Sequence, residues 1–407
     1  MSHVHIIGAG LAGLSAGVAL AAAGRRVTLY EAGPAAGGRC RSYFDRELGC
    51  RIDNGNHLLL SGNRAALGYL AQIGAADSLA GPQRPLFPFV DVARGERWTV
   101  APSAGRLPWW LLRPSRRVPG TSARDYLALL RLLRARGSVA AALDDGGALY
   151  RRLLEPLAIA ALNTPPQQGA ATLLAQVVRE TLLRGGGATL PRFARVGLSE
   201  SFVDPAVAYI SARGGVLRTG QRIAALGIAA GRVAALDAVA LADDAQVVLA
   251  VPPPVAAALL PGLSVPDRFG AIVNVHVRAA ADPGPAGFVG LIGGTAEWAF
   301  VRPGIVSVTI SAADALAELP AETIAARVWP DLCAAFGLAG TLPPWRVVKE
   351  RRATFAATVA QEQRRPGART ALANLVLAGD WTATGLPATI EGAIRSGRTA
   401  AQLLLAR

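Results

Sequence analysis

The order of apolar and polar positions in the first thirty residues predicts a strand, a helix and a second strand. Residues 4–7 form an apolar run, residues 11–23 are alanine-rich and uncharged, and residues 27–30 form a second, mainly apolar run. Gly24 ends the helix between them. A strand–helix–strand unit of this length is typical of an α/β fold with a parallel sheet.

Further along the chain, the pattern predicts short strands between turn residues, and two longer helices. The strands are expected at residues 233–236, 246–251, 272–278, 288–292, 306–311 and 375–378. One helix is expected over residues 321–336, and another ends at residues 403–405. The uncharged run at residues 6–24 resembles the apolar region of a signal peptide, but no basic segment precedes it. We therefore expect neither a signal peptide nor a transmembrane helix.

Composition excludes several classes of protein. The chain has 407 residues, of which 52% are hydrophobic and 17% charged, so it is long enough for two domains and too apolar to be disordered. Three cysteines without a CxxC pair and only four histidines predict neither a disulfide framework nor a metal site. A protein facing a reducing, cytosolic compartment is expected.

The net charge of +14 leaves nucleic acid and anionic membranes open as partners, and half of it lies in one segment. Residues 106–136 hold eight arginines and one acid, which gives 8 − 1 = +7, with Trp109 and Trp110 among the arginines. Ser122 is placed to cap a helix with an apolar face at Tyr126, Leu129, Leu130 and Leu133. We expect Trp109 and Trp110 to anchor the protein peripherally on an anionic membrane. A core helix with a solvated basic face is the alternative.

The turn after the first strand carries a dinucleotide-binding motif, Gly8-Ala-Gly10-Leu-Ala12-Gly13. Gly8 allows the tight turn, Gly10 lets the backbone approach a pyrophosphate, and Gly13 lets the helix pack close to the sheet. Glu31 ends the second strand, where an acid accepts hydrogen bonds from ribose hydroxyls and repels a 2′-phosphate. No second motif of this kind follows, so we expect an external electron donor that reaches the cofactor by another route.

The next segments resemble the FAD-dependent amine oxidase and carotenoid desaturase superfamily. Gly37, Gly38 and Arg39 match its GG-R motif, and Gly55, Asn56 and His57 belong to a D-x-G-like segment. The resemblance implies that the first group contacts the FAD diphosphate and that the second lies beside the flavin. Arg39 and the nearby Arg41 read equally well as solvated surface residues.

The last forty residues resemble the C-terminal FAD motif of the same superfamily. Gly379 and Asp380 follow a buried strand, and a Thr/Gly/Pro-rich approach leads into the last helix at Pro387, Thr389 and Ile390. The resemblance implies that Asp380 binds the ribityl chain or pyrophosphate, that the helix points its N-terminus at the flavin, and that the backbone near Ile223 contacts adenine. An ordinary helix cap is the alternative for Asp380.

These observations predict an α/β fold: a Rossmann-like FAD-binding domain of glutathione-reductase-type topology beside a mixed-sheet and helical substrate domain. The FAD-binding domain is expected to be discontinuous. We assign residues 1–75, 205–265 and 345–407 to it, and residues 76–204 and 266–344 to a substrate and membrane-facing domain.

A narrower resemblance is to the hydroxysqualene dehydroxylase family of bacterial hopanoid biosynthesis. It is carried by residues 53–63, 155–166 and 198–207. It implies FAD-dependent reduction of hydroxysqualene, a C30 isoprenoid, to squalene, with hydride passing from flavin N5 to an allylic cation. His57 is the first candidate for the acid or oxygen-orienting group, with Asn56 and Asn163 as further polar contacts. A neutral His57 that binds flavin or backbone is equally consistent, and Glu200 or Asp204 are other candidates for the acid.

Three other functions fit part of these motifs. A carotenoid or isoprenoid desaturase uses the same cofactor with hydride moving in the opposite direction, which the motifs do not fix. An amine oxidase typically has a lysine facing the flavin, and Lys349 is the only lysine in the chain. A non-catalytic FAD-binding or lipid-binding partner is the third. Nucleic acid is not expected as a partner, because no recognised binding motif is present.

Overall fold

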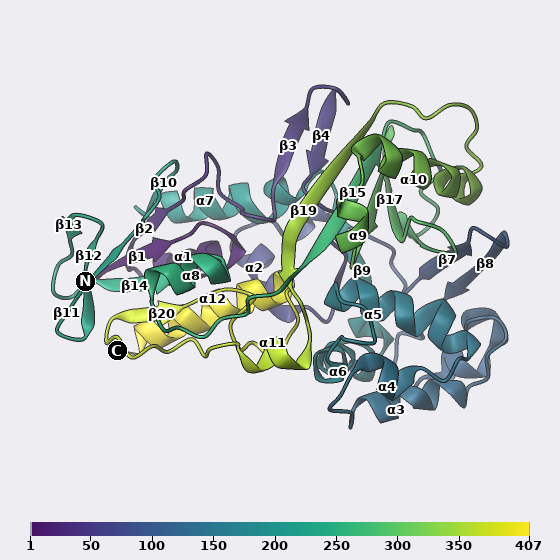
Figure 1. The fold of residues 1–407 in the computed structure, drawn as a ribbon, viewed down its shortest axis with the longest axis horizontal. Coiled ribbons are helices and arrows are strands. Elements are labelled where there is room, and N and C mark those ends of the chain that lie inside the picture. Colours follow the sequence, from purple (N-terminus) through teal and green to yellow (C-terminus); the bar gives the residue numbers. More distant parts are fainter. Residues whose placement is uncertain (1, 407) are drawn as a thin grey trace.

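The computed structural model describes residues 2–406 and contains two large sheets and a group of helices (Figure 1). The first sheet has five parallel strands in the order β10-β2-β1-β14-β20. Its strands come from the beginning, the middle and the end of the chain: β1 (His3–Ile7), β2 (Arg26–Tyr30), β10 (Val216–Arg218), β14 (Gln246–Leu249) and β20 (Leu375–Leu377). This is the Rossmann-like sheet predicted from the first thirty residues.

Two helices from opposite ends of the chain cover this sheet together. α1 (Leu11–Ala22) packs along α12 (Ile390–Leu405), and α7 (Asp204–Ser211) also packs on α1. The contact between α1 and α12 is close because the residues there are small: a Cβ on Gly397 would lie 2.2 Å from the carbonyl oxygen of Ala12. The Ser15 hydroxyl donates to the Ile394 carbonyl across the same interface at 2.8 Å.

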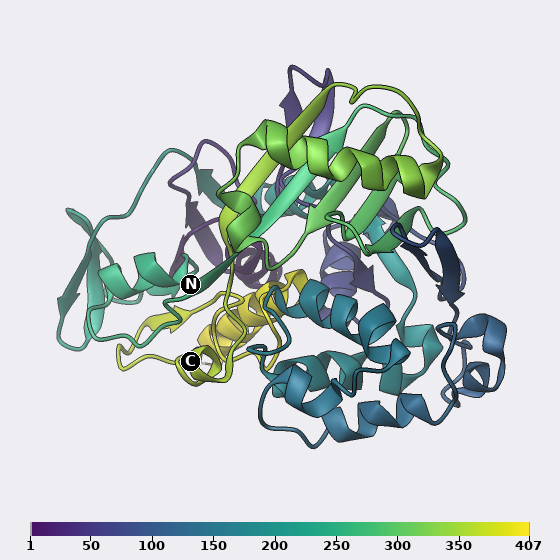
Figure 2. The same cartoon turned by 45° about the vertical axis from the view of Figure 1, so that its right-hand side comes forward.

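The second sheet has seven strands in the order β19-β15-β18-β17-β16-β7-β8 and is antiparallel except where β16 meets β7. The strands are β7 (Phe87–Asp91), β8 (Glu96–Val100), β15 (Phe269–Val277), β16 (Phe288–Ile292), β17 (Trp298–Arg302), β18 (Ile305–Ile310) and β19 (Trp345–Phe355). One face, which we call the outer face, packs against α10 (Ala321–Phe336), and the short α9 (Asp314–Ala317) precedes that helix (Figure 2). The predicted strands at 272–278, 288–292 and 306–311 and the helix at 321–336 are confirmed.

The structure differs from the predicted domain boundaries at one strand. β19 begins at Trp345, which was assigned to the FAD-binding domain, but it pairs along its length with β15 of the second sheet. The chain therefore returns to the first sheet only after Phe355. The other domain limits stay predictions.

The remaining elements connect these layers. The helical region contains α3 (Ala128–Leu132), α4 (Val139–Leu143), α5 (Glu155–Leu162) and α6 (Ala171–Glu180). Short sheets are formed by β3 (Ser42–Asp45) with β4 (Cys50–Asp53), by β5 (Leu59–Leu60), β9 (Pro191–Ala194) and β6 (Leu79–Ala80), and by β11 (Leu226–Ala229), β12 (Arg232–Leu236) and β13 (Val239–Ala240). The other helices are α2 (Arg64–Gln72), α8 (Pro253–Leu259) and α11 (Val359–Gln363). None of the helices within residues 2–406 is long and apolar enough to cross a bilayer.

The prediction of a helix capped by Ser122 is wrong. The chain forms a single 3-10 turn at Asp125–Leu127 and then the five-residue α3. The Asp125 carboxylate accepts the backbone N–H of Ser122 at 2.7 Å, so Ser122 is a donor here and caps nothing. The buried side chains are Tyr126, Ala128 and Leu132, while Leu130 is exposed. Packing of Tyr126 on Trp110, rather than a 3.6-residue period, sets this orientation.

Candidate functional site

The carboxyl ends of the parallel strands bring the predicted nucleotide-binding residues to one edge of the first sheet. Gly8 follows β1 and donates its N–H to the Tyr30 carbonyl at the end of β2, 2.7 Å away. Gly379 and Asp380 come two and three residues after β20, whose neighbour β14 is paired in parallel with β1. Ligands of open α/β sheets bind outside this edge.

The three motif glycines differ in what surrounds them. Gly8 has a φ of +100°, and a Cβ on it would lie 2.4 Å from the Ala250 carbonyl oxygen. A Cβ on Gly13 would lie 2.0 Å from the carbonyl oxygen of Gly8. A Cβ on Gly10 would meet nothing within 4 Å. Gly8 and Gly13 are therefore required by the protein itself, whereas Gly10 faces the open space expected to hold a pyrophosphate. Ala12 lies on the other side of α1, against α12.

Glu31 is fixed beside the glycine-rich turn. One carboxylate oxygen accepts the N–H of Ala9 at 3.0 Å, and the other accepts the N–H of Gly33 at 2.8 Å. The backbone of Gln221 donates to the Glu31 carbonyl at 2.9 Å, which brings the loop containing Ile223 to the same strand end. Each carboxylate oxygen keeps acceptor capacity for a ribose hydroxyl, and the Ile223 loop lies where the adenine contact is predicted.

The N-terminal and C-terminal motifs meet in an ion pair. Gly37 and Gly38 both have positive φ, and Gly37 donates its N–H to the Ala9 carbonyl at 2.8 Å. The turn places Arg39 so that its Nη2 lies 2.6 Å from Oδ2 of the buried Asp380. Arg39 keeps 45% of its side-chain surface exposed, so the guanidinium can bind a phosphate while it holds Asp380.

A buried arginine that the sequence did not reveal shapes the loop before α12. The Arg365 side chain is fully buried and donates to the carbonyl oxygens of Asp380 and Thr382 and to the Thr384 hydroxyl. After this loop, Thr389 caps α12: its hydroxyl oxygen accepts the Gly392 N–H at 3.0 Å. Ile390 begins the helix and Pro387 precedes the cap. Arg365 has no local motif, so only its contacts identify it.

Asn56 ties the segment after β4 to the second sheet. Its side-chain N–H donates to the Thr309 hydroxyl at 3.1 Å, and that hydroxyl donates to the Asn274 side-chain oxygen at 2.7 Å. Gly55 passes over the same asparagine: a Cβ on Gly55 would lie 3.1 Å from Asn274 Nδ2. The face of the sheet that carries Asn274 and Thr309, which we call the inner face, therefore lies against this segment.

His57 follows directly and is electrically neutral at pH 7. Burial lowers the pKa of its imidazole to about 4, against the opposing pull of the Asp53 carboxylate. His57 nevertheless keeps some accessible surface. The neutral imidazole can donate a hydrogen bond, but at neutral pH it holds no imidazolium proton to release.

Asn163 is occupied by structural contacts. It ends α5 in the left-handed conformation, with φ 47° and ψ 40°. Its side-chain N–H donates to the Thr354 hydroxyl at 2.9 Å, and its side-chain oxygen accepts the Ala312 N–H at 2.6 Å. Both ends of the amide bind protein, and the role of Asn163 as a polar contact for a substrate stays a prediction. It joins the helical region to the second sheet.

The inner face changes from polar to aromatic away from Asn56. Trp298 lies opposite Thr309 on the neighbouring strand, so the two side chains share this face. Phe288 contacts Trp298 and Phe300, with ring centroids 6.2 and 5.9 Å apart, and Phe193 contacts Phe300 at 6.0 Å. We call Phe193, Phe288, Trp298 and Phe300 the aromatic wall.

The two other candidate acids lie just before α7 and in its first turn. Glu200 forms an ion pair with Arg51 at 2.6 Å. Asp204 lies in the first turn of α7, where a carboxylate stabilises the helix N-terminus. Lys349 lies on the outer face opposite Val273, and its ammonium donates to the Leu319 carbonyl. The only lysine therefore does not face the cofactor edge.

Comparison with known proteins identifies the family. The family model for flavin-containing amine oxidoreductases matches residues 11–283 and 291–405. The hydroxysqualene dehydroxylase of Rhodopseudomonas palustris is 52% identical over 410 residues, which cover 99% of this chain and 98% of that protein. The enzyme of the same name from Zymomonas mobilis is 47% identical over 411 residues, covering 100% and 99%. The chain belongs to the hydroxysqualene dehydroxylase family of flavin-containing amine oxidoreductases.

More distant relatives share the fold or one segment. A putrescine oxidase structure superposes with a TM-score of 0.71 at 17% identity and covers all of both chains. An L-amino-acid oxidase of Bungarus fasciatus is 44% identical over 72 residues, 18% of this chain. FAD is therefore the cofactor of this chain. The open space at Gly10, the fixed carboxylate of Glu31 and the Arg39–Asp380 ion pair fit a bound FAD.

The contrast between two glycines gives a test of the FAD site. We expect Gly13→Ala to lower the unfolding free energy of the cofactor-free protein by more than about 2 kcal/mol, because the new methyl group meets a backbone carbonyl. Gly10→Ala is expected to change it by less than about 0.5 kcal/mol and to weaken FAD binding at least about tenfold. Urea unfolding and FAD titration measure the two effects. Equal FAD affinity in Gly10→Ala and the unsubstituted protein would contradict the assignment.

The neutral state of His57 gives a second test. With a pKa of about 4, His57 loses its proton well below pH 6, so its titration leaves the rate unchanged between pH 6 and 8. His57→Gln keeps a hydrogen-bond donor, and we expect it to retain turnover within about tenfold, whereas loss of a general acid costs about 100-fold or more. The measurement is kcat against pH for both proteins. A kcat that falls as the pH rises from 6 to 8, and that loses this dependence in His57→Gln, would show that His57 is the acid.

Proposed function

We propose that this protein reduces hydroxysqualene to squalene with FAD as its cofactor. The observation that carries the proposal is the identity of 52% with a hydroxysqualene dehydroxylase over nearly the whole of both chains. The aromatic wall beside the His57 segment is consistent with it, because an apolar C30 chain needs an apolar surface next to the reacting centre.

The reaction replaces a hydroxyl by hydrogen, so hydroxysqualene, one hydride and one proton give squalene and water. The substrate is an allylic alcohol, and departure of its protonated hydroxyl leaves a delocalised cation. FAD, when bound and reduced, supplies the hydride. An external donor must return two electrons to the cofactor after each turnover.

The residues of this chain have three tasks in that reaction. His57 donates a hydrogen bond that orients the departing oxygen, since its imidazole is neutral and its segment is predicted to lie beside the flavin. Asn56 holds this segment on Thr309 and so fixes the position of His57. The aromatic wall keeps this side of the site apolar and excludes water.

One of the other functions is less compatible with the structure, and a second is not separated by it. A lysine-dependent amine oxidase needs a lysine at the flavin, and Lys349 lies on the outer face. A desaturase shares the cofactor and the apolar wall, so only the direction of hydride transfer separates it from the proposed function.

A single-turnover experiment determines that direction. Anaerobic, photoreduced holoenzyme is mixed with one equivalent of hydroxysqualene, and flavin absorbance and products are followed together. We expect the flavin to reoxidise as one equivalent of squalene forms. As the control, oxidised holoenzyme is mixed with squalene and should stay oxidised. Reduction of the flavin in that control, with a dehydrogenated product, would establish the desaturase instead.

We further propose that the protein attaches peripherally to an anionic membrane on the cytoplasmic side. Five large apolar side chains of the basic segment are between 54% and 66% exposed, and we call them the docking surface: Leu107, Trp109, Leu112, Leu127 and Leu130. The segment includes α3, which lies at the edge of the helical region (Figure 1). Exposed apolar groups among arginines favour the interface of an anionic bilayer, where the substrate partitions.

Trp110 does not belong to the docking surface, which corrects the predicted pair of anchors. It is 9% exposed, and its ring packs edge-on against Tyr126 at 5.3 Å. Trp109 and Trp110 are adjacent in a 3-10 turn, so they point in different directions, and only Trp109 is free to insert.

Two double variants test membrane attachment. Trp109→Ala/Leu112→Ala is expected to lower binding to phosphatidylglycerol vesicles at least about tenfold, because about 0.8 kcal/mol is lost for each inserted methylene group removed. The matched control is Ile228→Ala/Val239→Ala, which removes exposed apolar side chains from the β11–β13 sheet. Vesicle co-sedimentation compares them, and equal binding by both variants would count against the docking surface.

A further inference from the structure

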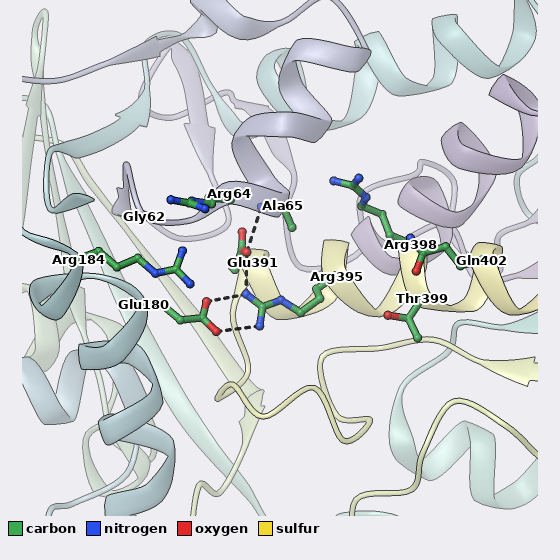
Figure 3. A pocket seen from close by; sticks show the side chains of 10 residues that line it. All are labelled: Gly62, Arg64, Ala65, Glu180, Arg184, Glu391, Arg395, Arg398, Thr399 and Gln402. Atoms are coloured by element: carbon green, nitrogen blue, oxygen red, sulfur yellow. Dashed lines mark hydrogen bonds and ion pairs between the residues drawn. The ribbon is translucent and has the colours of Figure 1, made fainter. Parts of the chain in front are cut away.

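A pocket lined by arginines lies on the surface formed by the end of α6, the start of α2 and the outward side of α12 (Figure 3). Its volume is about 410 Å³. The lining residues are mostly polar or charged: Gly62, Arg64, Ala65, Glu180, Arg184, Glu391, Arg395, Arg398, Thr399 and Gln402. Only Gly62 belongs to a segment that the sequence analysis used, and the proposed reaction uses none of the lining residues.

The two acids of the pocket are fully engaged by groups of the protein. Arg395 binds both carboxylate oxygens of Glu180, at 3.0 and 2.6 Å, and one oxygen of Glu391 at 3.0 Å. Glu391 also accepts the N–H groups of Ala65 and Ala66 at the start of α2. Hydrogen bonds from Arg395 lower the pKa of Glu180, so this carboxylate stays ionised at neutral pH. These hydrogen bonds connect α6, α12 and α2 at the base of the pocket.

The other three arginines differ from Arg395, although the charge of Arg184 also helps to lower the pKa of Glu180. Within residues 2–406, the guanidinium groups of Arg64, Arg184 and Arg398 form no hydrogen bond and no ion pair, unlike that of Arg395. In Figure 3, Arg64 and Arg184 lie on one side of Glu391, and Arg398 lies on the other. Four arginines and two glutamates give the pocket a charge of 4 − 2 = +2.

We propose that this pocket binds the phosphate groups of a ligand that carries at least two negative charges. Guanidinium groups bind phosphate oxygens through paired N–H donors, and three unpaired ones around one hollow favour a multiply charged anion over a single carboxylate. Thr399 and Gln402 add neutral hydrogen-bond donors. Phosphate groups of this kind occur on soluble diphosphates and dinucleotides and on anionic lipid headgroups. None of the predicted FAD-binding residues lines the pocket, although Glu391 directly follows Ile390, and the proposal does not depend on the identity of the substrate.

The test uses FAD-loaded protein, so that the flavin site does not take up the probe. Inorganic diphosphate, NADPH and phosphatidylglycerol vesicles are titrated at 0.1 M salt, the vesicles in a Trp109→Ala/Leu112→Ala background that removes the docking surface. We expect Arg64→Gln/Arg184→Gln/Arg398→Gln to weaken binding at least about thirtyfold, with several-fold lost for each arginine. The matched control Arg84→Gln/Arg327→Gln/Arg369→Gln removes the same charge from exposed arginines outside the pocket and should bind normally.

Each arm has a defined outcome. Binding of diphosphate or NADPH that is lost only in the pocket variant supports a soluble phosphate ligand, and vesicle binding lost only in that variant supports a lipid headgroup. The proposal is overturned if no probe binds, or if pocket and control variants weaken binding equally, because the effect is then one of net charge. A circular-dichroism melt shows that the variants are folded, as expected for exposed side chains.

Discussion

The close packing of α1 on α12 is the constraint on which the cofactor site depends. Gly397 lies so near the Ala12 carbonyl that no side chain fits between the two helices, and Ser15 bonds across the contact to Ile394. The helices begin immediately after the glycine-rich turn and after Thr389, so their packing fixes the distance between motifs more than 360 residues apart in sequence. The Arg39–Asp380 pair forms at this junction. A partly exposed ion pair contributes little stability, so the helix contact positions the site and the ion pair completes it.

Arginine serves several different purposes in this chain, and its position decides which. Arg365 is fully buried and organises the loop before α12, and Arg395 joins three helices through two glutamates. The exposed arginines of residues 106–136 surround apolar side chains, and three others ring a pocket without partners. A net charge of +14 is thus the sum of separate structural and binding roles.

The two faces of the second sheet have different roles: the inner face borders the predicted flavin site, and the outer face packs against α10. Asn274 and Thr309 lie on the inner face, against the segment that contains Asn56, and the aromatic wall continues that face. Lys349 lies on the outer face. Glu297 illustrates the same rule. Burial raises the pKa of its carboxyl to about 7, which would suit a general acid, but its carbonyl pairs with the Leu291 N–H, and Leu291 packs toward α10. Glu297 directly precedes Trp298 of β17, so its side chain lies on the outer face, away from the aromatic wall. A perturbed pKa therefore indicates burial here rather than catalysis.

The sequence by itself determined the nucleotide-binding turn, the order of the main strands and the family. Those features depend on neighbouring residues: a positive φ at Gly8, a forbidden Cβ at Gly13 and a strand on each side leave few alternatives. The tertiary structure alone decided that Trp110 is buried beside an exposed Trp109. It also decided that Asn163 is held by two hydrogen bonds to the protein, and that Lys349 lies on the outer face of the second sheet. Each of these depends on partners far away in the sequence or on a shift of one residue in register, and a shift of one residue turns a side chain to the opposite face without changing the hydrophobic pattern.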